Sequence, residues 1–482
     1  MNVQSSIAAP KGCLIDNRWQ SVPETIAVLD PSDGQPFAEI ADGGPAEIEA
    51  AVAAARRAFD GGAWSKLTAA ERGRLLSKQG EAVARHADEL AALEARDTGK
   101  PLKQARADMV ACARYFEFYG GAADKLHGET IPFLSGYQVQ AWYEPYGVTG
   151  HIIPWNYPAQ MFGRTLAPAL AVGNSTVLKP AEEASLTPLR LAELAVEAGF
   201  PPGAINLVTG RGETAGAALA ESPQIDFLSF TGSPEVGVLI QSAAARNHIG
   251  CTLELGGKSP QIVFEDADLE KALPVLVGAI VQNGGQTCSA GSRALIQHSV
   301  WDAVLTRLKD RFEHLTAAPS LEDRDLGPLI SATQKARVEA FIAEAKAPLI
   351  ARGAISAAAP DSGFYVAPAL YGPVEESDPL AQDEVFGPVL SLIPFEDEAE
   401  AVRIANGTDY GLVAGVWSEN AGRQMRMAKA LRCGQVFLNG YGAGGGIELP
   451  FGGVRKSGHG REKGFAALYE FAQLKTVVQN HG

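Results

Sequence analysis

Residues 146–158 read YGVTGHIIPWNYP, and from this stretch onward the chain alternates short strands with helices. Val148–Ile153 is a short apolar run, which is typical of a buried strand. The same alternation continues downstream, with strands expected at 175–178, 206–209 and 227–230 and helices expected at 189–198 and near 214–220. Strands that alternate with helices predict an α/β fold, with a parallel, doubly wound sheet covered by helices on both faces.

A second α/β series begins after Gly257. Its strands are expected at 261–264, 389–394, 413–417 and 435–438. Two helices are predicted upstream of residue 146. The first begins near Pro45, because apolar residues recur at helical spacing after it and proline suits a first helical turn. The second begins at Thr68, because Thr68 and Glu71 form the pattern of a capping box. The alternating residues 137–143 predict an extended, hairpin-like segment.

Composition sets limits on the class of protein. A chain of 482 residues is too long for one core, so two or three domains are expected. The net charge of −15 argues against nucleic-acid binding, because a phosphate backbone needs a basic face. The five cysteines are scattered and have neither metal-ligand nor disulfide-scaffold spacing. No signal peptide is evident at the N-terminus. The longest apolar run, 272–281, is too short to span a bilayer. We therefore expect a soluble cytoplasmic protein without a metal site.

Cys288 lies in the run NGGQTCSAGSR at 283–293, between glycines and small polar residues. Small neighbours leave the sulfur open to a substrate and let backbone N–H groups turn toward a developing negative charge. A free cysteine is, however, more often a buried structural residue. The local run alone leaves both interpretations open.

Four further motifs contain residues suited to chemistry. Asn156 follows a strand between rings and prolines and could donate to an oxyanion, or it could make an ordinary turn. Lys179 and Glu182 follow the next strand and could hold ribose hydroxyls, or form a solvated pair. Ser233 begins a helix that could bind phosphate, and Glu254 ends an apolar strand where its raised pKa would suit a general base, although most such glutamates are simply exposed.

Together with EVFGP at 384–388 and PFGGVRKSG at 450–458, these motifs occur in an order that resembles the NAD(P)-dependent aldehyde dehydrogenase family, from about residue 15 to 477. The resemblance implies a Rossmann-type NAD-binding domain, an α/β catalytic domain and a small β oligomerisation element. The corresponding ranges are 1–124 with 146–255, then 256–468, and 125–145 with 469–482. A homodimer or homotetramer follows, since an exposed strand edge favours a partner.

The resemblance also implies the catalytic roles. Cys288 would attack an aldehyde to form a thiohemiacetal, whose oxyanion is stabilised by the side chain of Asn156 and the backbone N–H of Cys288. Hydride transfer would leave a thioester, and Glu254 would activate the water that hydrolyses it. Family members that transfer the acyl group to coenzyme A tend to lack a base at this position, so Glu254 favours release of a free acid.

The cofactor residues are implied in the same way. Lys179 and Glu182 match the pair that holds the adenosine ribose, and Ser233 matches the pyrophosphate contact. The carboxylate of Glu182 would repel a 2′-phosphate, which favours NAD over NADP, although Lys179 partly offsets the repulsion. The nicotinamide end would be contacted by Glu384, Phe386 and Trp155.

The chain departs from the common family pattern around the substrate. Arg164 and Thr165 stand where many members have an aromatic residue and Lys, and an Arg at the first position resembles succinic semialdehyde dehydrogenases, where it grips the substrate carboxylate. Gln282 replaces the second Arg of those enzymes. The glycine-rich loop 440–449 suggests a roomy mouth. We expect a small-molecule aldehyde that bears a carboxylate, carbonyl or phenolic oxygen and can have a bulky or aromatic body, with Arg164 and Gln282 as donors. A structural ion pair is the alternative role of Arg164.

Two other classes of function are compatible with an accessible cysteine on this fold. A cysteine hydrolase or acyltransferase would use Cys288 without nicotinamide, but it needs a histidine partner, and His151, His248 and His298 carry no matching motif. A non-catalytic binding protein on the same fold is the other class. It is disfavoured because Cys288, Glu254 and Asn156 are all present.

Overall fold

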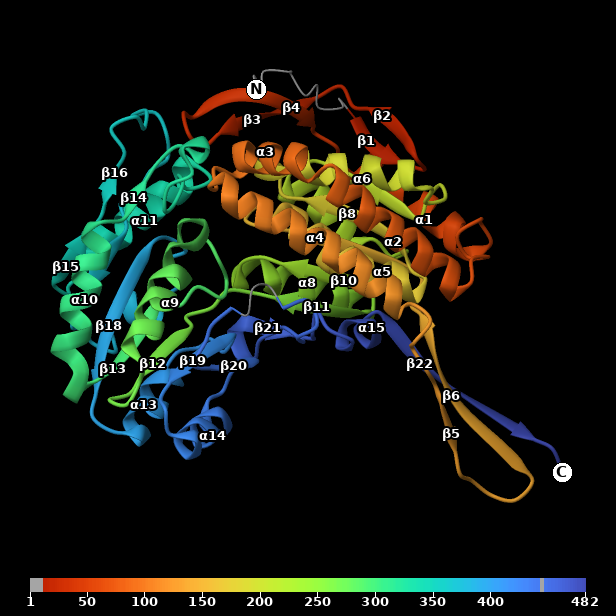
Figure 1. The fold of residues 1–482 in the computed structure, drawn as a ribbon. Coiled ribbons are helices and arrows are strands. Elements are labelled where there is room, and N and C mark those ends of the chain that lie inside the picture. Colours follow the sequence, from red (N-terminus) through yellow and green to blue (C-terminus); the bar gives the residue numbers. More distant parts are fainter. Residues whose placement is uncertain (1–11, 443–445) are drawn as a thin grey trace.

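The computed structural model describes residues 12–442 and 446–482, which form two large sheets flanked by helices and a smaller projecting sheet (Figure 1). The first sheet has the order β2-β1-β9-β8-β7-β10-β11-β21, and its inner strands from β9 to β11 run parallel. The bounds are β1 Gly12–Ile15, β2 Arg18–Ser21, β7 Val148–Ile153, β8 Ser175–Pro180, β9 Ile205–Leu207, β10 Phe227–Thr231, β11 Gly250–Glu254 and β21 Gly458–His459. The predicted α/β class is confirmed, and every strand predicted in this region is present.

Helices cover this sheet: α1 Pro45–Asp60, α2 Ala69–Arg85, α3 Ala87–Thr98, α4 Leu102–Ala122, α5 Pro158–Val172, α6 Leu186–Ala198, α7 Ala217–Glu221 and α8 Pro234–Arg246. The predicted capping box is present, since Thr68 accepts from the backbone N–H of Glu71 and Glu71 accepts from that of Thr68. The helix predicted near 214–220 instead begins as a π turn, Gly212–Gly216, and continues as α7.

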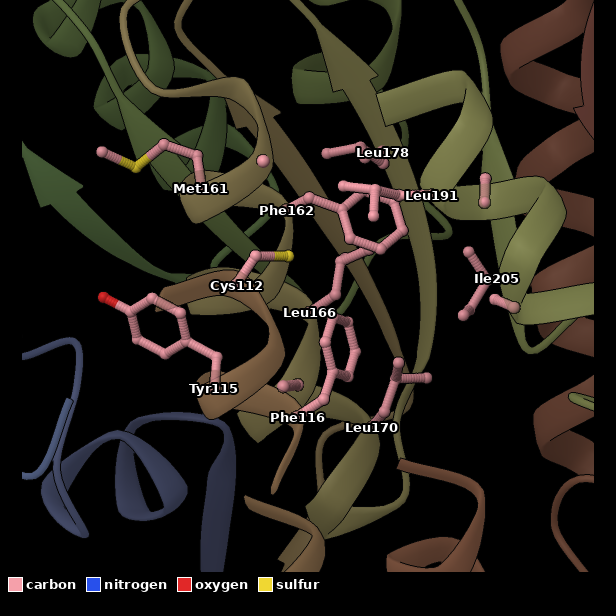
Figure 2. Close-up of a cluster of buried hydrophobic side chains, with 14 of the residues drawn as sticks. Cys112, Tyr115, Phe116, Met161, Phe162, Leu166, Leu170, Leu178, Leu191 and Ile205 are labelled. Carbon is pink, nitrogen blue, oxygen red and sulfur yellow. The ribbon is translucent and has the colours of Figure 1, made fainter. Parts of the chain in front are cut away.

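The apolar core beneath these helices packs around α5, the helix that follows β7. Phe116 of α4 and Phe162 of α5 lie with ring centroids 6.1 Å apart in the apolar cluster of Figure 2. Apart from Gln160, every residue of α5 is buried. A helix surrounded on all sides places even its charged residue, Arg164, inside the protein.

The second sheet has the order β15-β17-β18-β13-β12-β19-β20 and is parallel except for β15. Its strands are β12 Pro260–Val263, β13 Arg293–Gln297, β15 Leu349–Arg352, β17 Ala369–Tyr371, β18 Val389–Phe395, β19 Val413–Trp417 and β20 Gln435–Leu438. The helices here are α9 Leu269–Val281, α10 Trp301–Glu313, α11 Ala332–Glu344, α12 Pro379–Gln382, α13 Glu398–Ala405 and α14 Ala421–Ala430. The four strands expected after Gly257 are present within one or two residues of their predicted ends.

The third sheet projects from the rest of the molecule (Figure 1) and has the order β22-β6-β5. β6, Tyr137–Pro145, contains the predicted extended segment and pairs with β5, Glu129–Ile131, and with β22, Ala472–Asn480, near the C-terminus. The remaining pairs are β3 Thr25–Asp30 with β4 Gln35–Ala41 and β14 Thr316–Ala317 with β16 Ala354–Ile355, and a short helix, α15 Ala466–Glu470, precedes β22. Within the described ranges, no helix combines the length and apolar character needed to cross a membrane.

Candidate active site

The carboxyl ends of four parallel strands place four of the predicted residues along one edge of the first sheet. Asn156 follows β7, Lys179 lies near the end of β8, Ser233 follows β10 and Glu254 is the last residue of β11. Neighbouring β10 and β11 are in register, with Thr231 opposite Glu254. This edge is where open α/β sheets bind ligands.

Cys288 reaches the same place from the second sheet, in the loop before β13. The loop approaches the Glu254 strand closely, because a Cβ added at Gly257 would lie 2.4 Å from the carbonyl oxygen of Cys288. Only glycine permits that approach. The glycine three residues after Glu254 therefore lets the strand end and the cysteine loop meet.

Two open cavities meet at Cys288, which is the lining residue that they share. The first cavity encloses about 850 Å³ of space, part of which is open to solvent. Its lining includes Trp155, Asn156, Ser233, Glu254, Glu384 and Phe386. The second has a volume of about 1180 Å³ and its lining includes Tyr157, Arg164, Gln282, Phe437, Phe451 and Lys463. A sulfur that faces both cavities can contact a ligand in each.

The amide of Asn156 is held beside the cysteine loop. Its Nδ2 donates to the carbonyl of Gln286 at 2.9 Å, which leaves its second N–H available to an oxyanion. Its own backbone carbonyl accepts from Lys100 Nζ at 3.0 Å and from Asn283 Nδ2 at 2.9 Å. The fully buried ammonium of Lys100 is paired in turn with the carboxylates of Glu94 and Asp108.

Glu254 is buried, and neither of its carboxylate oxygens accepts a hydrogen bond from a described residue. Burial raises the pKa of Glu254 well above its ordinary value, and the nearby positive charge of Arg164 opposes that shift. A carboxylate with a raised pKa and open acceptor positions can take a proton from water near neutral pH.

Cys288 is half-buried and lines both cavities. Desolvation nevertheless raises the pKa of the Cys288 thiol to about 11, with Arg164 acting in the opposite direction. The thiol is therefore the resting form at neutral pH, and attack on a carbonyl requires that its proton be removed.

The residues predicted for the nicotinamide end lie together. Glu384 Oε1 accepts from the backbone N–H of Gly257 at 2.8 Å, and a Cβ at Gly256 would lie 2.2 Å from the other oxygen. Burial raises the pKa of Glu384 to about 7. The rings of Trp155 and Phe386 meet edge to face with centroids 5.5 Å apart. These groups form one wall of the first cavity.

The residues predicted for the adenosine end are also paired. Lys179 Nζ lies 2.8 Å from Glu182 Oε2, while the other Glu182 oxygen accepts from the N–H of Gly212 at 3.4 Å. Burial raises the pKa of Glu182, but the ion pair with Lys179 outweighs it and leaves the pKa below its ordinary value. Ser233 caps α8 by accepting from Val236 N–H at 3.3 Å, and it lines the first cavity, whereas Lys179 and Glu182 do not.

On the second cavity, the two predicted substrate residues already have partners. The guanidinium of Arg164 is in ion-pair contact with Glu462 and lies 3.7 Å from Glu254 Oε2, with its Cζ 4.4 Å from the ring centroid of Phe451. Gln282 Nε2 donates to the hydroxyl of Tyr157 at 3.0 Å.

In the loop 440–449, Tyr441 donates to the carbonyl of Ser289 at 2.7 Å and lines the second cavity. The prediction of a roomy mouth depends on residues 443–445, which lie outside the described residues, and it stays a prediction.

Sequence reasoning did not identify several groups around this site. The first group is Lys100, which donates to the backbone carbonyl of Asn156 and is paired with Glu94 and Asp108. The second group is Glu462, which pairs with Arg164, and Lys463, which lies over the ring of Phe451. The adjacent charges Glu462-Lys463, just after the glycine-rich motif at 450–458, are the signal that could have indicated the second group. No histidine lines either cavity within the described residues, so the histidine partner that a cysteine hydrolase needs is missing from both linings.

The fold and the site together define an α/β protein in which a cysteine thiol lies between a dinucleotide-type binding edge and a second cavity. The sequence profile of the aldehyde dehydrogenase family matches residues 19–477. The chain therefore belongs to the aldehyde dehydrogenase family.

Individual relatives agree with this assignment. The chain is 42% identical over 461 residues to a mitochondrial benzaldehyde dehydrogenase of Antirrhinum majus, covering 94% of this chain and 86% of that protein. A crystal structure from Burkholderia cenocepacia, named provisionally as an aldehyde dehydrogenase, superposes with a TM-score of 0.97 at 61% identity, covering 98% of this chain and 100% of that one. An NAD⁺ complex of aldehyde dehydrogenase from Bacillus cereus superposes with a TM-score of 0.95 at 37% identity, covering 98% of this chain and 96% of that one.

Proposed function

We propose that this aldehyde dehydrogenase oxidises its aldehyde to the free carboxylic acid with NAD, through a covalent intermediate on Cys288. The observation that carries the proposal is the position of Cys288 between two cavities. One cavity presents the groups suited to a nicotinamide dinucleotide, and the other is free to hold an aldehyde.

The residues divide the reaction between them. The thiol of Cys288 gives its proton to solvent in the open cavity, and its sulfur attacks the aldehyde carbon to give a thiohemiacetal whose oxyanion accepts from Asn156 and from the Cys288 N–H. When bound, nicotinamide would supply the hydride acceptor needed for oxidation to the thioester. Glu254 then takes a proton from water, the resulting hydroxide attacks the thioester carbon, and the C–S bond breaks to release the acid.

NAD is the proposed cofactor rather than NADP. The carboxylate of Glu182 is ionised at neutral pH because Lys179 holds its pKa low, and an ionised carboxylate accepts from ribose hydroxyls but repels a 2′-phosphate. The NAD⁺ complex of the Bacillus cereus relative is consistent with this choice.

The proposed substrate carries a carboxylate, carbonyl or phenolic oxygen, on a semialdehyde or aromatic body. Support comes from the mixed lining of the second cavity, where the polar side chains of Gln282, Tyr157 and Lys463 occur together with the rings of Phe437 and Phe451. The benzaldehyde dehydrogenase among the relatives shows that a homologue is named for an aromatic aldehyde.

We further propose that the NAD-binding domain comprises 1–124 and 146–255, the catalytic domain 256–468, and the oligomerisation element 125–145 with 469–482. The three sheets support this division, although β21 joins the first sheet from within the catalytic range. The projecting sheet exposes apolar side chains suited to a homodimer or homotetramer, namely Ile131, Trp142, Leu474 and Val478. The cytoplasmic location stays a prediction.

The test is to mix the protein with NAD and benzaldehyde or propanal and to follow NADH absorbance and the acid product. We expect stoichiometric NADH and acid from the wild type and neither from Cys288→Ala. Undiminished oxidation by Cys288→Ala would refute the covalent role. Aldehyde-independent ester cleavage with no NADH would instead favour the cysteine hydrolase.

A further inference from the structure

Arg164 occupies an unusual place for a cation, because it lies on the buried helix α5 with its side chain only 5% exposed. Two buried carboxylates approach its guanidinium: Glu462 is in direct ion-pair contact and Glu254 lies at 3.7 Å. The ring of Phe451 covers one side of the guanidinium, 4.4 Å from its Cζ. The charge of Arg164 is thus directed at the proposed base as well as at the cavity.

Glu462 is itself fixed in place, which in turn fixes Arg164. Its Oε1 accepts from the hydroxyl of Ser229 at 3.3 Å, and Ser229 is bonded to Thr165 at 2.9 Å. The backbone of Glu462 pairs with that of Phe451 in both directions, at 2.6 and 2.8 Å. If Arg164 swung out to a substrate carboxylate, it would leave Glu462 as a buried charge without its counter-ion, which is strongly unfavourable.

We propose that Arg164 is a positioning residue for Glu254: anchored by Glu462, its guanidinium orients the base carboxylate beside Cys288 and stabilises its ionised form for thioester hydrolysis. This inference rests on the proposed function, since it assigns Arg164 to the hydrolysis step. It differs from the sequence-based expectation that Arg164 grips a substrate carboxylate.

The charges that face Glu254 come from several segments. Arg164 approaches from α5, while Glu462, Arg461 and Lys463 approach from the segment after β21. Arg164 has the largest effect of the charged groups, and it lowers the pKa of Glu254. Removing the guanidinium therefore raises that pKa, so the base is ionised only at higher pH.

The experiment compares wild type, Arg164→Met, Arg164→Lys and the double variant Arg164→Met/Glu462→Gln, which avoids a lone buried carboxylate. Stopped-flow NADH release is measured with the uncharged aldehydes propanal and benzaldehyde and with the charged succinic semialdehyde. We expect the NADH burst of Arg164→Met and of the double variant to persist while kcat falls about 10- to 100-fold for every aldehyde. For Arg164→Met, the acid limb of the kcat profile should move to higher pH by about one unit or more, and Arg164→Lys should move it less. The double variant should also move it less than Arg164→Met, because Glu462→Gln removes a charge that raises the pKa of Glu254.

Added hydroxylamine provides a second, independent measurement. Its nitrogen attacks the thioester carbon and the C–S bond breaks, giving a hydroxamate and free Cys288 without need of the base. We therefore expect hydroxylamine to restore turnover in the arginine variants but to change the wild type little.

Three outcomes would overturn the proposal. A raised KM for succinic semialdehyde alone, with an unmoved pH profile, would make Arg164 a substrate ligand. Equal losses of burst and steady-state rate without a pH shift in both the single and the double variant would make its role structural. A missing response to hydroxylamine would place the defect before the thioester. Absence of any NADH formation by the wild type with NAD and these aldehydes would instead refute the proposed function itself.

Discussion

Replacing Glu182 by Gln should change the cofactor preference of this enzyme. The substitution removes one negative charge at the proposed adenosine ribose and leaves the ammonium of Lys179, now 2.8 Å from a neutral amide, without its counter-ion. Two unit charges about 4 Å apart near a protein surface interact by about 4 kcal/mol. The Glu182 side chain is 26% exposed and Lys179 already offsets part of its field. We therefore expect about 1.4 to 2.8 kcal/mol of relief for a 2′-phosphate, which is about 10- to 100-fold in kcat/KM for NADP.

The assay measures kcat/KM for NAD and NADP with one aldehyde at saturation, for wild type and Glu182→Gln. NAD should lose no more than about tenfold, because the amide oxygen still accepts from a ribose hydroxyl. Glu183→Gln is the matched control, since it removes the same charge from the next, exposed residue. A gain for NADP of less than about twofold, or an equal gain in the control, would refute the reasoning, because neither fits a charge located at the ribose.

Three further substitutions test the site. Glu254→Gln should keep the NADH burst but lower kcat about 100-fold or more, because the thioester then lacks its base; a lost burst would contradict this role. Asn156→Ala should lower kcat about 100- to 1000-fold with little change in the KM for NAD, as measured by steady-state kinetics. Glu384→Gln should raise the apparent Tm most at about pH 8.5, less at about pH 5.5, and change it little below about pH 4.5, the ordinary pKa of a glutamate. Burial raises the pKa of Glu384 to about 7, so its favourable neutral form is lost as pH rises through that value; a gain at low pH instead would reverse the sign.

Local patterns predicted several strands of both sheets because most of these strands are short apolar runs that can be found without distant information. The inner strands β13 and β17 of the second sheet were missed. Val413–Trp417 and Gln435–Leu438 are present with the predicted ends. The two edge strands of the first sheet were not predicted, since β2 is exposed along its whole length and β21 has only two residues. Their pairing with β1 and β11 depends on tertiary contacts rather than on a local period.

The candidate site shows the same division between local and distant information. The positions of Asn156 and Glu254 at strand ends could be predicted, because each residue lies in a motif next to a recognisable strand. The environment of Arg164 could not be predicted, because Glu462 reaches it from a segment close to the C-terminus. A single charged residue in the sequence does not indicate whether its partner is a substrate or a buried carboxylate.

The two cavities also suggest that cofactor and substrate preferences can be altered separately. Their linings share Cys288, while Ser233 and Glu384 lie on one side and Gln282 and Phe437 on the other. Substitutions on separate walls without common partners should have nearly additive effects on free energy. Arg164 is the exception, because it lines the second cavity but lies 3.7 Å from Glu254, which lines the first. A change at Arg164 should therefore alter hydrolysis for every aldehyde, whereas a change at Gln282 should alter only the choice among aldehydes.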